Sequence, residues 1–159
     1  LWGPFITGLF FFMTYMGGCA GSTSGGLKTM RFLVAFKGVQ AQIKKLLYPH
    51  GVIISHYQGK ALGNNTITTV MGFLSLYVIL NVVLTMALTM TGLDTETAFS
   101  GAATAIANVG PGIGETIGPA GNFAALPDTA KWLLCLGMFL GRLEILTVLV
   151  IFSPYFWRH

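Results

Sequence analysis

The run Asn108-Val109-Gly110-Pro111-Gly112 is the part of the sequence best suited to binding an ion. It follows 98–107, an apolar stretch that as a helix would be about 15 Å long, half the thickness of a bilayer. Glycines permit backbone conformations in which successive carbonyls face one axis, where they replace the hydration shell of a cation. We therefore predict a re-entrant half-helix that ends in a cation-binding filter. An ordinary loop between two helices is the alternative.

A second candidate lies at residues 17–26, where five glycines follow the apolar run 4–16. The glycines predict that a membrane helix breaks midway and forms a flexible plug inside the membrane. Close packing of helices through small residues is the alternative. The segment also resembles a phosphate-binding loop, but Leu27 moves Lys28 one position out of the GxxxxGK[ST] register. A lipid-type helix rather than a buried strand precedes it, so we do not expect a nucleotide site.

Arg142 and Glu144 lie near the middle of the last apolar segment. A central arginine costs about 2.5–3.5 kcal/mol on membrane-insertion scales, which suggests a function. The two side chains are about 200° apart around a helix, so each needs another partner. A structural salt bridge between helices is the alternative. The sequence contains no paired carboxylates, no Ser-His-Asp set and no histidine cluster with metal-ligand spacing, so nothing in it indicates an enzyme.

The composition is that of a membrane protein. Hydrophobic residues make up 53% of the 159, and charged residues only 9%, against about 25% charged in a typical soluble domain. Residues 61–93 carry no charge at all. The net charge of +4 does not indicate nucleic acid, because six of the nine Lys and Arg residues cluster between positions 28 and 60. Neither Cys19 nor Cys135 has a partner at CxxC spacing, so we expect no disulfide or metal framework.

These patterns predict an all-α integral membrane fold in three parts. Residues 1–48 form a membrane helix that is broken at 17–26 and continues as a cytoplasmic helix, and residues 49–65 form a connecting hairpin. Residues 66–159 contain a helix over 66–91, a pore half-helix over 96–107, the filter at 108–112 and a helix over 128–153. The chain opens Leu1-Trp2-Gly3 without a methionine or a charged n-region, so we expect no signal peptide and interpret the sequence as a fragment of a longer chain.

The charge distribution predicts the orientation. The basic segment 28–60 and the C-terminus belong in the cytoplasm, where Lys and Arg are enriched. The connection 92–127 contains no Lys or Arg and belongs outside. We therefore expect Lys37, Lys44, Lys45 and Lys60 inside, and Glu115 and Asn122 outside.

Five motifs in this order resemble the Trk potassium-uptake family, and its bacterial Trk membrane subunit more than the related Ktr subunit. The resemblance extends over the whole chain. The motifs are 17–23 (GGCAGST), 25–28 (GGLK), 108–112 (NVGPG), 141–144 (GRLE) and 152–158 (FSPYFWR).

The resemblance implies a pseudo-fourfold K⁺ channel-like fold, in which four helix–pore-loop–helix repeats surround one pore. This chain would hold the end of the third repeat and all of the fourth. The implied filter is Asn108, Val109, Gly110, Pro111 and Gly112, with K⁺ at Asn108 and Val109. Arg142 would be the charge that lines the pore. The implied gating loop comprises Gly17, Gly18, Cys19, Ala20, Gly21, Ser22, Thr23, Gly25, Gly26 and Lys28.

The resemblance also implies partners. K⁺ would be the transported ion, and no cofactor is expected. The expected partners are membrane lipid, the remaining repeats of the full-length protein, a second copy in a homodimer and a cytoplasmic nucleotide-binding ring subunit, but no nucleic acid. The location would be the bacterial inner membrane. A non-conducting scaffold and a Na⁺-coupled Ktr-type transporter are the alternatives, and proton coupling, sodium coupling and passive flow all suit these residues.

Overall fold

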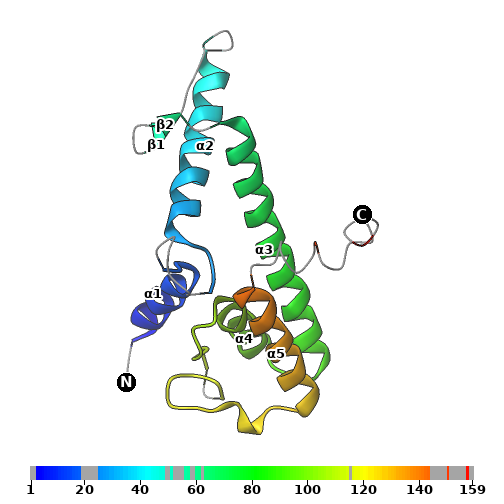
Figure 1. The fold of residues 1–159 in the computed structure, drawn as a ribbon. Helices are drawn as coiled ribbons and strands as arrows, with labels where there is room; N and C mark the ends of the chain where they lie inside the picture. Colours follow the sequence, from blue (N-terminus) through cyan, green and yellow to red (C-terminus); the bar gives the residue numbers. More distant parts are fainter. Residues whose placement is uncertain are drawn as a thin grey trace.

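The computed structural model describes residues 3–18, 25–48, 63–114 and 116–143, together with residues 51, 56–57, 60–61, 150 and 157. The all-α prediction is confirmed (Figure 1). The helices are α1 (Pro4–Tyr15), α2 (Thr29–Leu47), α3 (Asn64–Met90), α4 (Thr95–Ala107) and α5 (Asp128–Arg142), with a 3-10 turn, η1 (Phe123–Ala125). Two two-residue strands, β1 (His56–Tyr57) and β2 (Lys60–Ala61), pair antiparallel between α2 and α3.

Helix α3 has the length and the apolar composition of a membrane-crossing helix. Within the described part of the chain, its segment Asn65–Met90 alone is long and apolar enough to cross a bilayer. Its 27 residues extend for about 40 Å. One face points into the protein and carries the buried residues Phe73, Tyr77, Asn81, Leu84 and Leu88. The opposite face is apolar and exposed, with Val78, Ile79, Val82, Val83 and Met86. Such a face suits lipid or another hydrophobic segment.

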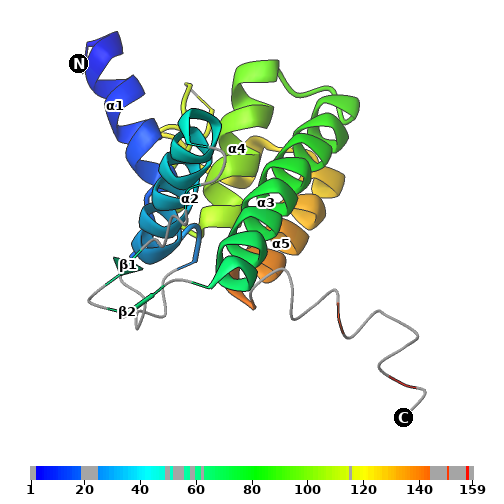
Figure 2. The same ribbon diagram turned by 90° about the horizontal axis from the view of Figure 1, so that it is seen from above.

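Helix α4 lies at the centre of the molecule, packed against α1, α3 and α5 (Figure 2). From Thr97 to Ala107 every residue except Phe99 is buried. Most of these residues are Ala, Gly, Ser or Thr, whose small side chains let neighbouring helices approach closely. Asp94 caps the N-terminus, its carboxylate accepting a hydrogen bond from the Glu96 N–H at 3.2 Å. The half-helix therefore begins with a cap and ends inside the protein.

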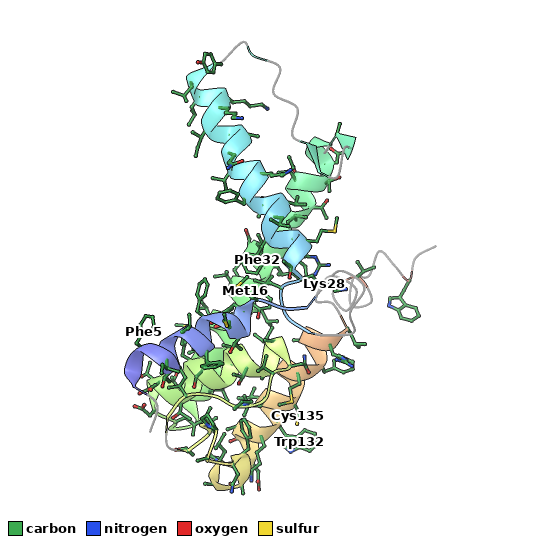
Figure 3. The ribbon with its side chains drawn as sticks, turned by 90° about the vertical axis from the view of Figure 1, so that its left-hand side faces the viewer. Phe5, Met16, Lys28, Phe32, Trp132 and Cys135 are labelled. Carbon is green, nitrogen blue, oxygen red and sulfur yellow. The ribbon has the colours of Figure 1, made fainter. Side chains whose placement is uncertain are left out.

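Helices α1 and α2 do not form one straight rod. They change direction between Met16 and Lys28, as Figure 3 shows. Helix α2 packs on α3, where Gly38 lies against Ile67 and the Arg31 guanidinium stands 3.9 Å from the centre of the Phe73 ring. The far end of α2 and the β1–β2 hairpin lie toward one end of α3, and the 110–127 connection toward the other (Figure 1).

Two expected elements extend beyond the described residues. The helix expected over 128–153 starts at Asp128 as α5, and the structure describes it as far as Arg142. Residues 144–149, which include Glu144, lie outside the described part. So does the turn of the connecting hairpin at residues 58–59.

Candidate functional site

The candidate filter begins where α4 ends. Asn108 adopts the left-handed conformation, with φ 56° and ψ 39°. Its N–H donates to the Ala105 carbonyl and the Val109 N–H to the Thr104 carbonyl, both at 3.1 Å. Gly110 has φ 113°, a backbone conformation that residues other than glycine rarely adopt. The negative end of the α4 dipole is therefore located at the first residues of the candidate filter.

Ser100 holds the chain that follows the filter. This buried hydroxyl accepts a hydrogen bond from the Ile113 N–H at 3.1 Å. Its own proton has two carbonyl acceptors at 3.4 Å, on Thr97 and Ile113. The Gly112 N–H donates to the Ile117 carbonyl at 2.7 Å. An added Cβ at Gly112 would collide with the Ile117 side chain. The loop is thus fixed to α4 on one side and to Ile117 on the other.

The two ends of the glycine-rich segment meet. The Gly17 N–H donates to the Leu27 carbonyl at 2.8 Å, and the Thr29 hydroxyl donates back to the Gly17 carbonyl at 3.1 Å. The Thr29 N–H donates to the Gly18 carbonyl at 3.3 Å. Hydrogen bonds therefore hold the two ends of this segment, next to α1 and α2, against each other. Its expected residues Cys19, Ala20, Gly21, Ser22 and Thr23 lie outside the described part of the chain.

The described end of this segment touches the start of the candidate filter. A Cβ built on Gly25 would lie 2.8 Å from Asn108 Nδ2 and 2.9 Å from the Ala107 carbonyl oxygen. Gly26 has φ 77°, and a Cβ there would lie 3.4 Å from the Ala107 Cα. Gly25 needs to be glycine because the neighbouring atoms leave no room for a side chain, and Gly26 because its φ is positive. The structure thus brings together two motifs that lie far apart in the sequence.

Helix α5 meets the same point from another side. Asn108 Nδ2 donates to the Met138 carbonyl at 3.1 Å and to the Ile106 carbonyl at 3.4 Å. Gly141 lies so close to the Ile106 carbonyl that a side chain could not fit there. Arg142 follows directly, in the last turn of α5, and is exposed. Lys28 is located at the N-terminal cap of α2.

A cavity of about 540 Å³ separates α1 from the filter loop. On the α1 side it is lined by Phe10, Phe11 and two threonines, and the Thr14 hydroxyl donates to the Phe10 carbonyl at 3.2 Å. On the loop side its wall includes Val109, whose side chain is 51% exposed. The walls are mainly apolar, so this space suits packing rather than ion coordination.

Three contributions to this site do not follow from the motifs: the Ser100 hydroxyl, the Thr29 hydroxyl and the Met138 carbonyl. A signal for the first exists in the sequence. Thr97, Ser100 and Thr104 recur at spacings of three and four, so they form a polar stripe on one face of an otherwise apolar half-helix. The partners of Thr29 and Met138 depend on the tertiary fold, and no local pattern indicates them.

Comparison with known proteins decides the family. The model of the TrkH family, described as cation transport proteins, matches residues 1–158. The chain belongs to this family. The resemblance inferred from the five motifs is thereby confirmed. Membership of this family, together with the long apolar helix α3, identifies the chain as part of a membrane protein.

Individual TrkH-family relatives match along nearly the whole chain. The Trk system potassium uptake protein TrkI of Halomonas elongata is 53% identical over 157 residues, which are 99% of this chain and 32% of the relative. The potassium uptake protein TrkH of Escherichia coli K12 is 39% identical over the same share. The crystal structure of the potassium transporter TrkH from Vibrio parahaemolyticus matches with a TM-score of 0.88 and 40% identity, covering 99% of this chain and 33% of that one. The chain spans about a third of the length of these relatives.

Proposed function

We propose that this chain is part of a transporter that takes up K⁺ across the bacterial inner membrane. The observation that carries the proposal is the contact of Gly25 with Ala107 and Asn108. It joins a glycine-rich segment to a candidate filter at the buried end of a half-helix. The names of the relatives, which describe potassium uptake, support K⁺ as the ion.

In this proposal, residues 108–112 form the fourth repeat's share of the filter. Carbonyls of Asn108 and Val109 would replace water around K⁺, and the remaining repeats would supply the other sides. The negative end of α4 favours a cation at this point. The left-handed Asn108 and the positive φ of Gly110 support the role, because they let the chain leave the helix abruptly.

The gate in this proposal has two parts. The segment 17–28 obstructs the path sterically beside the start of the filter, where Gly25 and Gly26 are packed. Arg142 adds a positive charge, which raises the barrier for a cation where water is scarce. Its position directly after Gly141, which touches Ile106, supports this role.

The proposal extends to the surroundings of the chain. Lipid and the remaining repeats would cover the exposed apolar face of α3. A second copy of the full-length protein and a cytoplasmic nucleotide-binding ring subunit would complete the assembly. The basic helix α2 would face the cytoplasm and the ring, and the 92–127 connection would face outside.

Rubidium flux through the full-length protein in proteoliposomes tests the function. Wild-type protein should take up ⁸⁶Rb⁺ in preference to ²²Na⁺. Arg142→Ala, or deletion of residues 18–22, should raise the flux without changing the preferred ion. A barrier lower by about 1.4 kcal/mol gives about a tenfold rise, which is the smallest effect we expect.

Lys131→Ala is the matched control, because it removes a positive charge at the other end of α5, where Lys131 is paired with Asp128 at 3.1 Å. It should leave the flux unchanged. Wild-type protein that inserts correctly but conducts no cation would point to a scaffold and end the proposal. Unchanged flux in Arg142→Ala with a lower melting temperature in detergent would make the arginine a structural ion-pair partner, and its role in the gate would be withdrawn.

A further inference from the structure

The side chain of Asn108 lies between two glycines that belong to different elements. A Cβ on Gly25 would approach its Nδ2 to 2.8 Å, and a Cβ on Gly141 would approach the same atom to 3.0 Å. The amide therefore occupies the space that both glycines leave open. One glycine belongs to the segment that precedes α2 and the other to the last turn of α5.

The amide also makes a hydrogen bond across helices. Nδ2 donates to the Met138 carbonyl at 3.1 Å, joining positions 30 residues apart. Met138 is four residues before Arg142, so its carbonyl lies one helical turn before that arginine. The bond therefore ties the first residue of the candidate filter to the turn of α5 that carries the exposed arginine.

Asparagine suits this position for two separate reasons. Its backbone is left-handed, a conformation that asparagine adopts more readily than most residues. Its amide N–H₂ can donate to a carbonyl, whereas an ionised aspartate of the same shape can only accept. Glycine would meet the first requirement but not the second. Substitutions can therefore separate the backbone requirement from the hydrogen bond.

We propose that the Asn108 side chain is a positioning residue that clamps the start of the filter to α5 through the Met138 carbonyl. The clamp fixes the orientation of the Asn108 and Val109 carbonyls, and so contributes to discrimination between K⁺ and Na⁺. In this proposal the ion contacts main-chain carbonyls, and the Asn108 amide acts only by holding those carbonyls in position. This inference rests on the proposed K⁺ uptake.

Two variants of the full-length protein test the clamp in proteoliposomes. Asn108→Gly keeps the left-handed backbone and removes the amide. Asn108→Asp keeps the shape and removes the donor while the carboxyl is ionised. At pH 7.5 both should lower the ratio of ⁸⁶Rb⁺ to ²²Na⁺ uptake, by roughly fivefold if one ordinary hydrogen bond is lost. Both should insert and elute from size-exclusion chromatography like wild type.

The pH profile distinguishes a hydrogen bond from simple packing. As the pH falls through the pKa of the introduced carboxyl, Asn108→Asp gains a proton that it can donate to Met138, so its selectivity should recover. Asn108→Gly should stay unselective at every pH. The matched control is Asn122→Asp. Asn122 accepts a hydrogen bond from the Ala124 N–H at 3.0 Å, and a carboxylate can accept in the same way. Its uptake should follow wild type throughout.

Wild-type selectivity in both Asn108 variants at pH 7.5 would overturn the clamp. So would an Asn108→Asp variant that stays as unselective as Asn108→Gly at low pH, because the side chain would then act through its packing or charge. Failure of wild-type protein to take up ⁸⁶Rb⁺ would instead refute the proposed function on which the clamp rests.

Discussion

At the scale of single residues, the Ser100 hydroxyl joins the half-helix to the loop that follows the candidate filter. Ser100 is 1% exposed, and its oxygen accepts the Ile113 N–H. Ser100→Ala would leave that part-buried N–H without this acceptor, and the cost should not exceed the range of about 1–3 kcal/mol found for fully buried donors. We expect full-length Ser100→Ala to insert normally, to melt at a lower temperature in detergent and to select less well for ⁸⁶Rb⁺ over ²²Na⁺.

Ser75→Ala is the matched control for Ser100→Ala. The Ser75 hydroxyl donates to the Met71 carbonyl within α3 and is exposed, so its loss leaves no buried donor unpaired. It should change neither melting temperature nor selectivity. Equal behaviour of the two variants would show that the hydroxyl at position 100 does not hold the loop.

At the scale of elements, the glycines on the inner face of α5 set how closely it approaches α4. A Cβ on Gly141 would run into the Ile106 carbonyl, which is backbone and cannot turn aside. A Cβ on Gly137 would meet the end of the Leu84 side chain at 2.6 Å, which can adopt another rotamer. Gly141→Ala should therefore destabilise the protein by about 1–3 kcal/mol, the usual cost of overpacking, and Gly137→Ala by less.

Thermal unfolding of the full-length protein in detergent measures this difference. Gly8→Ala on α1 is a suitable control, because a Cβ there meets nothing within 4 Å. Its melting temperature should equal or exceed that of wild type. If Gly141→Ala melted like Gly8→Ala, the close approach of α5 to α4 would be unnecessary for stability.

Local sequence patterns predict some elements of this fold and not others. The long uncharged stretch and its capping residues predict a helix over 66–91, and α3 covers Asn64–Met90. The glycines and Pro111 predict the end of the half-helix, which α4 reaches at Ala107. The glycines predict that the helix breaks between α1 and α2, but they do not predict the angle between the two helices, because glycine permits many backbone conformations. Nor do they predict the meeting of Gly25 with Asn108, which depends on tertiary packing.

At the scale of the whole molecule, charge is separated along the length of α3. Helix α2 carries Lys44 and Lys45 in its last turn, toward the same end as the β1–β2 hairpin (Figure 1). The connection that contains η1 lies toward the other end and has no Lys or Arg between Gly92 and Pro127. Because α3 extends for about 40 Å, it can separate the two ends by the thickness of a bilayer. Cytoplasmic segments are enriched in Lys and Arg, so the α2 end should face inward.

Labelling of single cysteines tests this orientation in the full-length protein. Lys45 and Asn122 are both exposed, so a cysteine at either position should react where the reagent can reach it. In a background with Cys19 and Cys135 replaced by serine, along with any other native cysteine of the full-length protein, a membrane-impermeant maleimide should label Asn122→Cys in intact cells. It should label Lys45→Cys only after the membrane is permeabilised, which also shows that both positions are reactive. Labelling of position 45 but not 122 in intact cells would reverse the orientation, because the basic end would then face outside. It would also remove α2 from the face that a cytoplasmic ring subunit could reach.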